Sequence, residues 1–301
     1  MESPRNSGFA TSWKTLSVLA AGVAVFFAVA HAQNSKRGGE PFETFKAQQF
    51  DHSTEITNKW MPMKQGTRWI YEGSTIEEDG KVVPHRIEIA ATDLVKSIGG
   101  VRAVVTYGVD YTDNELVEAE LAFYAQDNSG NVWLLGEYPE EYEDGKLTKA
   151  PAWIHGLQAA KAGIMMQAEP RLEMPSYSEG WAPAAGWTDR GMTYQMGQQV
   201  SVPAGTFNDV LVVKESARSE PDAEQLKYYA PGVGNVRVGW IGTKKVKEGL
   251  ELIKVEQLDP QMIADIRARA LNLEQSAYKH TKNVYAHTSP AIYVQRHKQG
   301  M

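Results

Sequence analysis

Alternating apolar and polar residues dominate the chain from Gly66 to Gln257. Stretches such as "TRWIYEGST", "VRAVVTYGV" and "DVLVVKES" repeat with a period of two and are separated by turns rich in Gly, Asn or Asp. This period is typical of β-strands, because successive strand side chains point to opposite faces. No ten-residue helical periods alternate with these stretches, which excludes a doubly wound parallel sheet. The pattern therefore predicts a mainly β fold of antiparallel strands.

One of these segments, "ELVEAELAFYAQD", separates apolar from acidic residues. Val117, Leu121 and Phe123 share one face of the predicted strand, whereas Glu118 and Glu120 share the other. An antiparallel sheet commonly packs one face on a core and leaves the other in water. We therefore expect these carboxylates to be solvated.

The next residues, "DNSGN", invite a comparison with calcium-binding loops. An EF-hand needs a central Gly at position six and a bidentate Glu at position twelve. Counted from Asp127, this chain has Gly130 at position four and Glu137 at position eleven. Because Asn and Gly also favour tight turns, the stretch predicts a hairpin between Ala125 and Val132 and no metal site.

The run "GEYPEEYEDGK", which begins at Gly136, gathers carboxylates that could suggest acid–base catalysis. A glycosidase needs two carboxylates at a fixed separation, one of them in a dry setting. We interpret this run as a flexible, solvated turn, which provides neither condition, and contact with a divalent cation is the alternative.

Other catalytic and cofactor signatures fail on spacing. The chain has no Cys, no Gly-x-Ser-x-Gly, and no His pair at zinc-binding spacing. Gly232 and Gly234 lead into a predicted strand, so no helix N-terminus is available there for a phosphate. We assign no catalytic, metal or cofactor residues, and an enzyme is the least supported function.

Aromatic and sulfur-containing residues gather between Pro151 and Trp187, where the strand pattern breaks. A long irregular segment of this kind often covers a sheet edge or a cavity. Trp and Met fill core gaps in most proteins, but over a curved sheet they can also line an apolar pocket. The candidate pocket residues are Trp153, Met165, Met166, Tyr177, Trp181 and Trp187.

After Leu258 the pattern changes to helical spacing. Asp259 is a good N-cap, Pro260 suits the first helical position, and apolar residues from Ile263 to Ala277 recur every three or four residues. We expect an amphipathic helix to about Lys279, followed by a tail that is either disordered or docked as an extended strip.

Four blocks carry a resemblance: "FYAQDNSGNVWLLGE", "AGIMMQAEPRLEMPSYSEGW", "VSVPAGTFNDVLVVKE" and "LKYYAPGVGNVRV". As a set, between about Phe50 and Leu258, they resemble a group of bacterial secreted proteins of unknown function. "WAPAAGWTD" departs from that group's pattern. "PAGTF" and "YAPGVG" are also similar to the half-barrel domains of lipoprotein carriers. The resemblance implies a curved antiparallel sheet, a half-barrel or open barrel, and it implies no activity.

The N-terminal segment predicts the compartment. Arg5 and Lys14 precede the uncharged run "TLSVLAAGVAVFFAVA", and small residues surround a cleavage point after Ala32. We expect a signal peptide at 1–32, a flexible leader at 33–49, a β domain at 50–258, and a helix with tail at 259–301. The alternative is a retained N-terminal anchor. With a net charge of −6 and no basic stretch, the chain is not expected to bind nucleic acid.

The leading hypothesis is an exported, non-catalytic binding module, periplasmic or extracellular, that holds a small apolar or lipid-like ligand in the concavity of its sheet. The alternative is an envelope scaffold that binds a protein partner through residues 260–301. In neither case is the protein integral to the membrane after cleavage.

Cleavage between Ala32 and Gln33 is directly testable. Because the charged, apolar and small-residue regions follow in signal-peptide order, the exported protein should begin at Gln33. Intact-mass analysis of the envelope fraction would give this mass, and an intact Met1 end would show a retained anchor instead.

Overall fold

The computed structural model describes residues 42–77, 79–218, 220–243 and 245–294. The predicted signal peptide and the leader up to residue 41 lie outside these ranges. The elements, in chain order, are η1 Ala47–Gln49, β1 Thr67–Ile76, β2 Val82–Ile98, β3 Val101–Thr112, β4 Glu115–Gln126, β5 Val132–Glu143, β6 Lys146–Lys149, β7 Trp153–Ile154, β8 Lys161–Met166, β9 Tyr177–Ser178, β10 Gly180–Trp181, η2 Pro183–Ala185, β11 Asp189–Val202, β12 Gly205–Ala217, β13 Glu220–Ala230, β14 Gly234–Gly242, β15 Lys247–Gln257, α1 Pro260–His280, α2 Lys282–Tyr285 and β16 Ile292–Tyr293.

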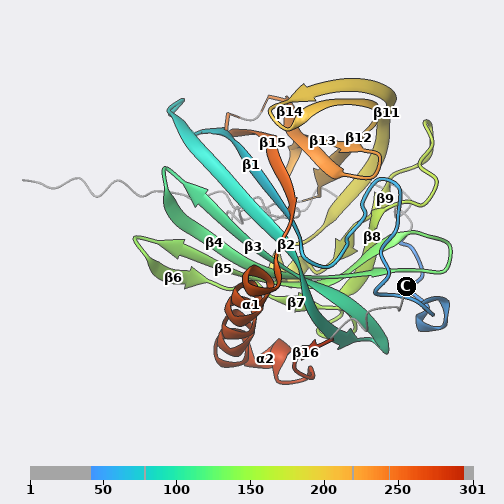
Figure 1. Ribbon diagram of the computed structural model, residues 1–301, viewed down its shortest axis with the longest axis vertical. Helices are drawn as coiled ribbons and strands as arrows, with labels where there is room; N and C mark the ends of the chain where they lie inside the picture. Colours follow the sequence, from blue (N-terminus) through green and yellow to red (C-terminus); the bar gives the residue numbers. More distant parts are fainter. Residues whose placement is uncertain (1–41, 78, 219, 244, 295–301) are drawn as a thin grey trace, which may run out of the picture.

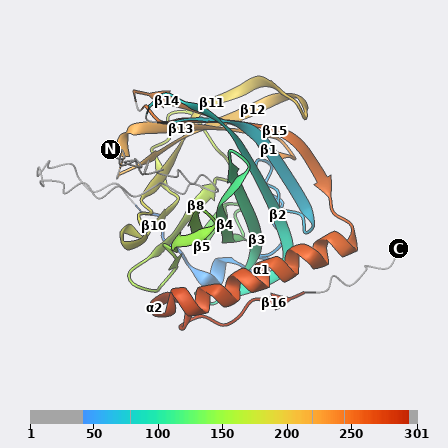
Figure 2. The same ribbon diagram turned by 90° about the vertical axis from the view of Figure 1, so that its left-hand side faces the viewer.

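The strands form a single antiparallel sheet that curls into a nearly closed barrel (Figures 1 and 2). Long hairpins run in chain order from β2 to β5 and from β11 to β15, and β1 joins the two runs by pairing with both β2 and β15. The predicted mainly β, antiparallel fold with a curved sheet and a C-terminal helix is confirmed.

A short stretch from Tyr177 to Trp181 brings the two ends of the sheet together. Its first half, β9, pairs with β11, and its second half, β10, pairs with β8. Between them, the amide of Glu179 donates to the carbonyl of Asp189 at 2.9 Å. The region that the sequence predicts as an irregular cover thus contains four short strands, two of which close the barrel.

Glycine permits the close approach at this closure. An added Cβ on Gly163 in β8 would lie 2.2 Å from the backbone nitrogen of Gly180, far inside van der Waals contact. The closing stretch therefore packs backbone against backbone, which only a residue without a side chain allows.

Both faces of β4 are buried, because the barrel closes over one face and the helix covers the other. Leu121 and Phe123 belong to the outer face, against which α1 packs. Glu118 and Glu120 face inward and are only 2% and 4% exposed. The expectation that these carboxylates are solvated is wrong, since the inner face of a closed sheet looks into a lumen.

Helix α1 begins where the capping pattern predicts. The Asp259 carboxylate accepts a hydrogen bond from the Met262 amide at 2.8 Å, and Ala270, Leu273 and Ala277 are buried. The tail docks as far as the structure describes it: α2 buries Tyr285, and Ile292 in β16 pairs with β2. Helix and tail together cover the outside of the wall.

One buried ion pair fastens the helix to the sheet. The Lys96 ammonium on β2 lies 2.7 Å from the Glu274 carboxylate on α1 and donates to the Ser289 carbonyl at 2.7 Å. Glu274 also accepts from the backbone amide of Ala291. Burial lowers the pKa of Lys96, and the Glu274 charge opposes that change. Wall, helix and tail therefore meet at one charged contact.

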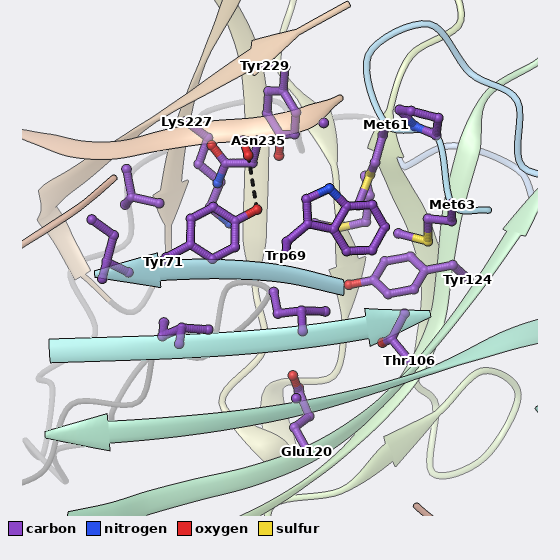
Figure 3. Close-up of a pocket in the computed structure, with 18 residues that line it drawn as sticks. Met61, Met63, Trp69, Tyr71, Thr106, Glu120, Tyr124, Lys227, Tyr229 and Asn235 are labelled. Carbon is purple, nitrogen blue, oxygen red and sulfur yellow. Dashed lines mark hydrogen bonds between the residues drawn. The ribbon is translucent and has the colours of Figure 1, made fainter. Parts of the chain in front are cut away.

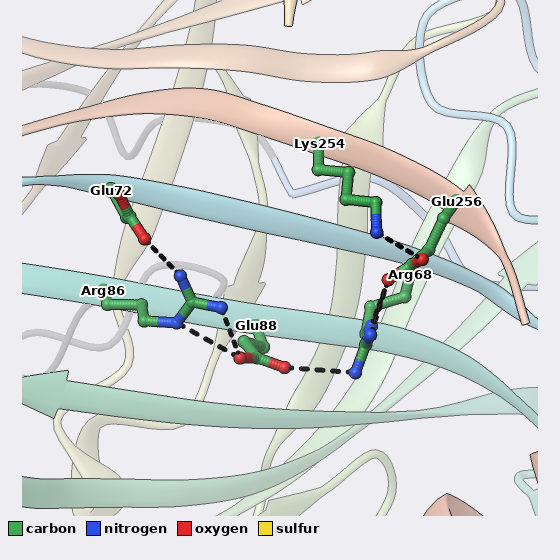
Figure 4. Close-up of polar contacts among 6 residues, drawn as sticks. All are labelled: Arg68, Glu72, Arg86, Glu88, Lys254 and Glu256. Atoms are coloured by element: carbon green, nitrogen blue, oxygen red, sulfur yellow. Dashed lines mark hydrogen bonds and ion pairs between the residues drawn. The ribbon is translucent and has the colours of Figure 1, made fainter. Parts of the chain in front are cut away.

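The outer face of β1, β2 and β15 carries a different kind of charge network (Figure 4). Arg68 donates to Glu256 at 2.5 Å across the β1–β15 pair and approaches Glu88 at 3.4 Å. These side chains are far more exposed than Lys96 and Glu274. The remaining members are Glu72, Arg86 and Lys254.

The two kinds of ion pair should respond differently to the same substitution. Glu274→Gln leaves the buried Lys96 ammonium without a counter-ion and should lower the free energy of unfolding by about 3–5 kcal/mol. Glu256→Gln, the matched control on the exposed network, should cost about 1 kcal/mol or less. Urea unfolding measures both, and equal small losses would contradict the anchoring role of Glu274.

Candidate functional site

A cavity of about 110 Å³ lies inside the barrel, mainly between β1–β4 and β13–β15 (Figure 3). Its walls are mostly apolar and aromatic, and half-buried residues of the 61–63 loop, Met61 and Pro62, lie at its rim. The principal apolar wall residues are Met63, Trp69, Tyr71, Ile87, Ile89, Met165, Val238 and Leu250.

Strand register brings these apolar side chains together. Trp69 pairs with Ile89 and Tyr71 with Ile87 across β1 and β2, so residues two apart on each strand face the same space. On the other side of β1, Gly73 pairs with Leu250. Alternation inside a curved sheet thus produces a continuous apolar wall.

The polar atoms of Trp69 and Tyr71 form hydrogen bonds within the protein. The Trp69 indole nitrogen donates to the Val233 carbonyl at 2.8 Å, and the Tyr71 hydroxyl donates to the Asn235 carbonyl at 3.0 Å. Both bonds fix the rings against the β13–β14 turn and the start of β14, and Figure 3 shows the bond from Tyr71. The ring faces therefore remain as apolar surface for the cavity.

The floor of the cavity is polar. Glu120 points its carboxyl group into the space, and Lys227 lines it from β13 (Figure 3). Burial raises the pKa of Glu120 well above its usual value, the charges of Glu137 and Glu118 raise it further, and Lys227 opposes them. Within the described chain Glu120 has no hydrogen-bond or ion-pair partner.

Further carboxyl groups lie behind Glu120 in the same lumen. Glu215 pairs with the Lys227 ammonium at 2.7 Å, and Glu137 accepts from the Trp153 indole at 3.0 Å. Glu179, in the closing stretch, is fully buried, and burial together with the charge of Glu215 raises its pKa well above the usual value. The lumen therefore contains more acidic than basic groups.

A second charged group occupies the lumen beside the apolar wall. His85 lies 2.7 Å from Asp110 through Nε2 and 2.9 Å from Glu248 through Nδ1, and the Thr75 hydroxyl lies 3.1 Å from Nδ1. Burial alone would lower the pKa of His85, but the two carboxylates outweigh it and raise the pKa to about 10. An imidazolium held by two carboxylates cannot accept a proton from Thr75, so this group is unsuited to nucleophilic catalysis.

Only Met165 of the six candidate pocket residues lines this cavity. Trp153, Met166, Tyr177 and Trp187 are buried around the closing strands, where the Trp153 and Trp187 rings lie 5.7 Å apart. Trp181 is half-buried against Phe42. In the sequence, the cavity wall is indicated by Trp69 and Tyr71, two aromatic residues at alternate positions that share one face of their strand.

The "DNSGN" stretch forms the predicted hairpin turn between β4 and β5. The Asp127 carboxylate accepts hydrogen bonds from the backbone amides of Ser129 and Asn131 and from the Trp133 indole. Its oxygens are thus occupied by protein donors. Across the described ranges, no group of three or more His, Cys, Asp or Glu residues is arranged to hold a metal ion.

The expectation of a solvated turn at "GEYPEEYEDGK" is wrong. Most of the run belongs to β5, and Glu137, Glu140 and Glu141 are buried. Glu140 accepts hydrogen bonds from Tyr138 and Tyr142 on the outer face, whereas Glu137 faces inward. Acidic residues at alternate strand positions look the same in sequence whether their face is wet or enclosed.

No protein-family model and no curated protein matches the chain. A candidate exported protein with a YmcC-like fold from Bacteroides fragilis NCTC 9343 is 13% identical, with a TM-score of 0.38 over 66% of this chain and 99% of its own. A candidate lipoprotein from Parabacteroides distasonis ATCC 8503 is 12% identical, with a TM-score of 0.34 over 66% and 99%. Similarities this low carry no inference about function.

In the part of the chain that the structure describes, no helix is both long and apolar enough to cross a bilayer.

The His85 group predicts a specific dependence on pH. Its folded pKa of about 10 exceeds the ordinary value of about 6.5, so its stabilisation is complete below about pH 6.5 and is lost as the pH rises toward 10. Within that window the free energy of unfolding should fall by up to about 1.4 kcal/mol per pH unit. Urea unfolding across the window measures this slope.

Ring nitrogen NMR tests the same group directly. The ¹⁵N resonances of His85 should remain those of a doubly protonated ring at pH 8, with the exposed His52 as an internal reference. A neutral His85 at that pH would contradict the assignment.

Proposed function

We propose that the protein is an exported, non-catalytic binding module that holds a small, mainly apolar ligand inside its barrel. The observation that carries the proposal is the cavity between Trp69, Ile87 and Leu250, which is walled by apolar groups and has a polar floor. Ligand sites in proteins commonly combine these two properties. Export is supported by the signal-peptide pattern of the N-terminal segment.

The volume favours a compact ligand. An engineered apolar cavity of about 150 Å³ accommodates benzene, whereas sites for drug-sized molecules occupy roughly 300–1,000 Å³. At about 110 Å³, this cavity fits a single ring or a short alkyl chain. A long acyl chain would require the wall or the 61–63 loop to move, so a small apolar molecule is preferred over a lipid.

The surroundings of the helix favour a ligand over the alternative scaffold role. Leu273 and Ala277 pack against the protein's own sheet, and Ile263 and Ile266 are half-buried. A partner that used this apolar face would have to displace intramolecular packing. The scaffold hypothesis would therefore rely on the remaining exposed surface of residues 260–294.

Methionine methyl NMR tests the proposal at the site itself. Benzyl alcohol, a single ring with a neutral polar end, should cause saturable shifts of the Met61, Met63 and Met165 methyl signals, because all three side chains line the cavity. The exposed Met174 and Met196 should not shift, since they lie outside it. Absence of saturable shifts at the three cavity methionines would refute binding in the lumen.

A pair of Trp substitutions provides the control. Ile89→Trp places a larger side chain at the cavity wall and should weaken benzyl alcohol binding at least tenfold. Val82→Trp adds the same group at an exposed position outside the cavity and should leave binding unchanged. Equal effects of both substitutions would indicate binding elsewhere.

A further inference from the structure

The carboxyl group of Glu120 is the least explained polar group of the cavity. It is 4% exposed, points into an otherwise mostly apolar space, and has no hydrogen-bond or ion-pair partner along the described chain. A buried polar group without a partner destabilises a fold, so its presence needs an explanation. One explanation is that the Glu120 carboxyl group forms its hydrogen bonds with a bound ligand.

The charged groups around Glu120 determine which kind of ligand group could bind its carboxyl group. Glu118 on its own strand and Glu137 on β5 add negative charge, and Asp110 on β3 belongs to the same inner face. Lys227 on β13 lowers the pKa of Glu120 by its charge, but its ammonium is already paired with Glu215 at 2.7 Å.

The rest of the lumen does not reverse this balance. Glu179 and Asp189 add acidic groups from the closing stretch and β11, and the His85 imidazolium is neutralised by Asp110 and Glu248. An anionic ligand would therefore meet repulsion beside Glu120, whereas a cation would be attracted.

We propose that the ligand of the lumen is a small amphiphilic amine whose ammonium group donates hydrogen bonds to the Glu120 carboxylate while its apolar part packs between Trp69, Ile87 and Leu250. This inference rests on the proposed ligand-binding function and specifies the class of ligand. An ammonium group satisfies both the missing hydrogen bonds and the missing positive charge. Tyr124 and Tyr229, which also line the cavity, bring in aromatic rings of the kind that attracts cations.

Ammonium binding should release a proton. Because burial and the neighbouring carboxylates raise the pKa of Glu120, the empty site holds its proton at higher pH than an ordinary glutamate does. A cation binds only the ionised form well, so binding displaces that proton. The affinity for an amine should consequently rise with pH by up to about tenfold per unit, until Glu120 is ionised in the free protein as well.

Three probes of the same shape test the inference: benzylamine, benzyl alcohol and benzoate. Titration calorimetry of the full mature protein should give benzylamine an affinity at least tenfold higher than benzyl alcohol and no measurable binding of benzoate. Repeating the benzylamine titration in buffers of different ionisation enthalpy should reveal up to one proton released per molecule bound. The affinity of benzylamine should also increase with pH for as long as the amine stays protonated and Glu120 still holds its proton in the free protein.

Variants of Glu120 assign the effect to one residue. Glu120→Gln should reduce benzylamine affinity to the level of benzyl alcohol on the same variant and abolish proton release. Glu120→Asp keeps the charge and should retain part of the preference for the amine. Should Glu120→Gln fail to fold, the ranking of the three probes and the proton release on the unmodified protein still decide the matter.

The outcomes separate this inference from the proposed function. Equal affinities for benzylamine and benzyl alcohol, without proton release, would overturn the amine assignment and leave the lumen as a ligand site. Preferential binding of benzoate would overturn it in favour of recognition by Lys227. Failure of all three probes to shift the cavity methionines would overturn both proposals.

Discussion

Backbone pairing on both sides of the Tyr177–Trp181 stretch is the interaction on which the rest of the structure depends. β9 bonds to β11 and β10 bonds to β8, so a stretch shorter than any of the main strands joins the two ends of the sheet. Closure buries the inward side chains, although the conformation of the strands that carry them stays the same. Glu118 and Glu120 would face water in an open sheet, and in the closed one they are buried on its inner face. The cavity, its acidic floor and the buried His85 group all follow from this one connection.

The lumen combines two environments that influence one another. Apolar walls around Trp69 and Leu250 lower the local dielectric, and this strengthens each charge interaction on the floor. Lys227 and His85 are therefore each held by carboxylates at hydrogen-bond distance. Neither of these two cations lies within hydrogen-bond distance of Glu120. The same burial that makes an unpartnered carboxyl group unfavourable also makes it selective, because a ligand with the wrong charge is poorly compensated in a low dielectric.

Local signals in the sequence predict the elements well, and non-local pairing decides the site. The period of two predicts the strands, Asp259 predicts the start of the helix, and "DNSGN" predicts its hairpin, since each depends on neighbouring residues. The burial of Glu137 could not be predicted in this way, because its inner face is enclosed only when β9 and β10 meet strands far along the chain. The sequence predicts a candidate pocket at the Trp- and Met-rich segment between Pro151 and Trp187. There the aromatic residues pack around the closure, while the cavity wall comes from alternate residues of β1, β2 and β15.

The contact between Lys96 and Glu274 also constrains the order in which the molecule can be completed. A polypeptide is made from its N-terminus, so Lys96 and the outer apolar face of β4 exist long before α1 and the tail that cover them. The pairing of β1 with β15 likewise waits for residues near the end of the chain. Such long sequence separations slow folding, because the chain must close a large loop before the contacts stabilise it. The barrel can therefore reach its final form only after β15, α1 and the tail have been synthesised, and until then its unfinished edges need protection from pairing with other chains.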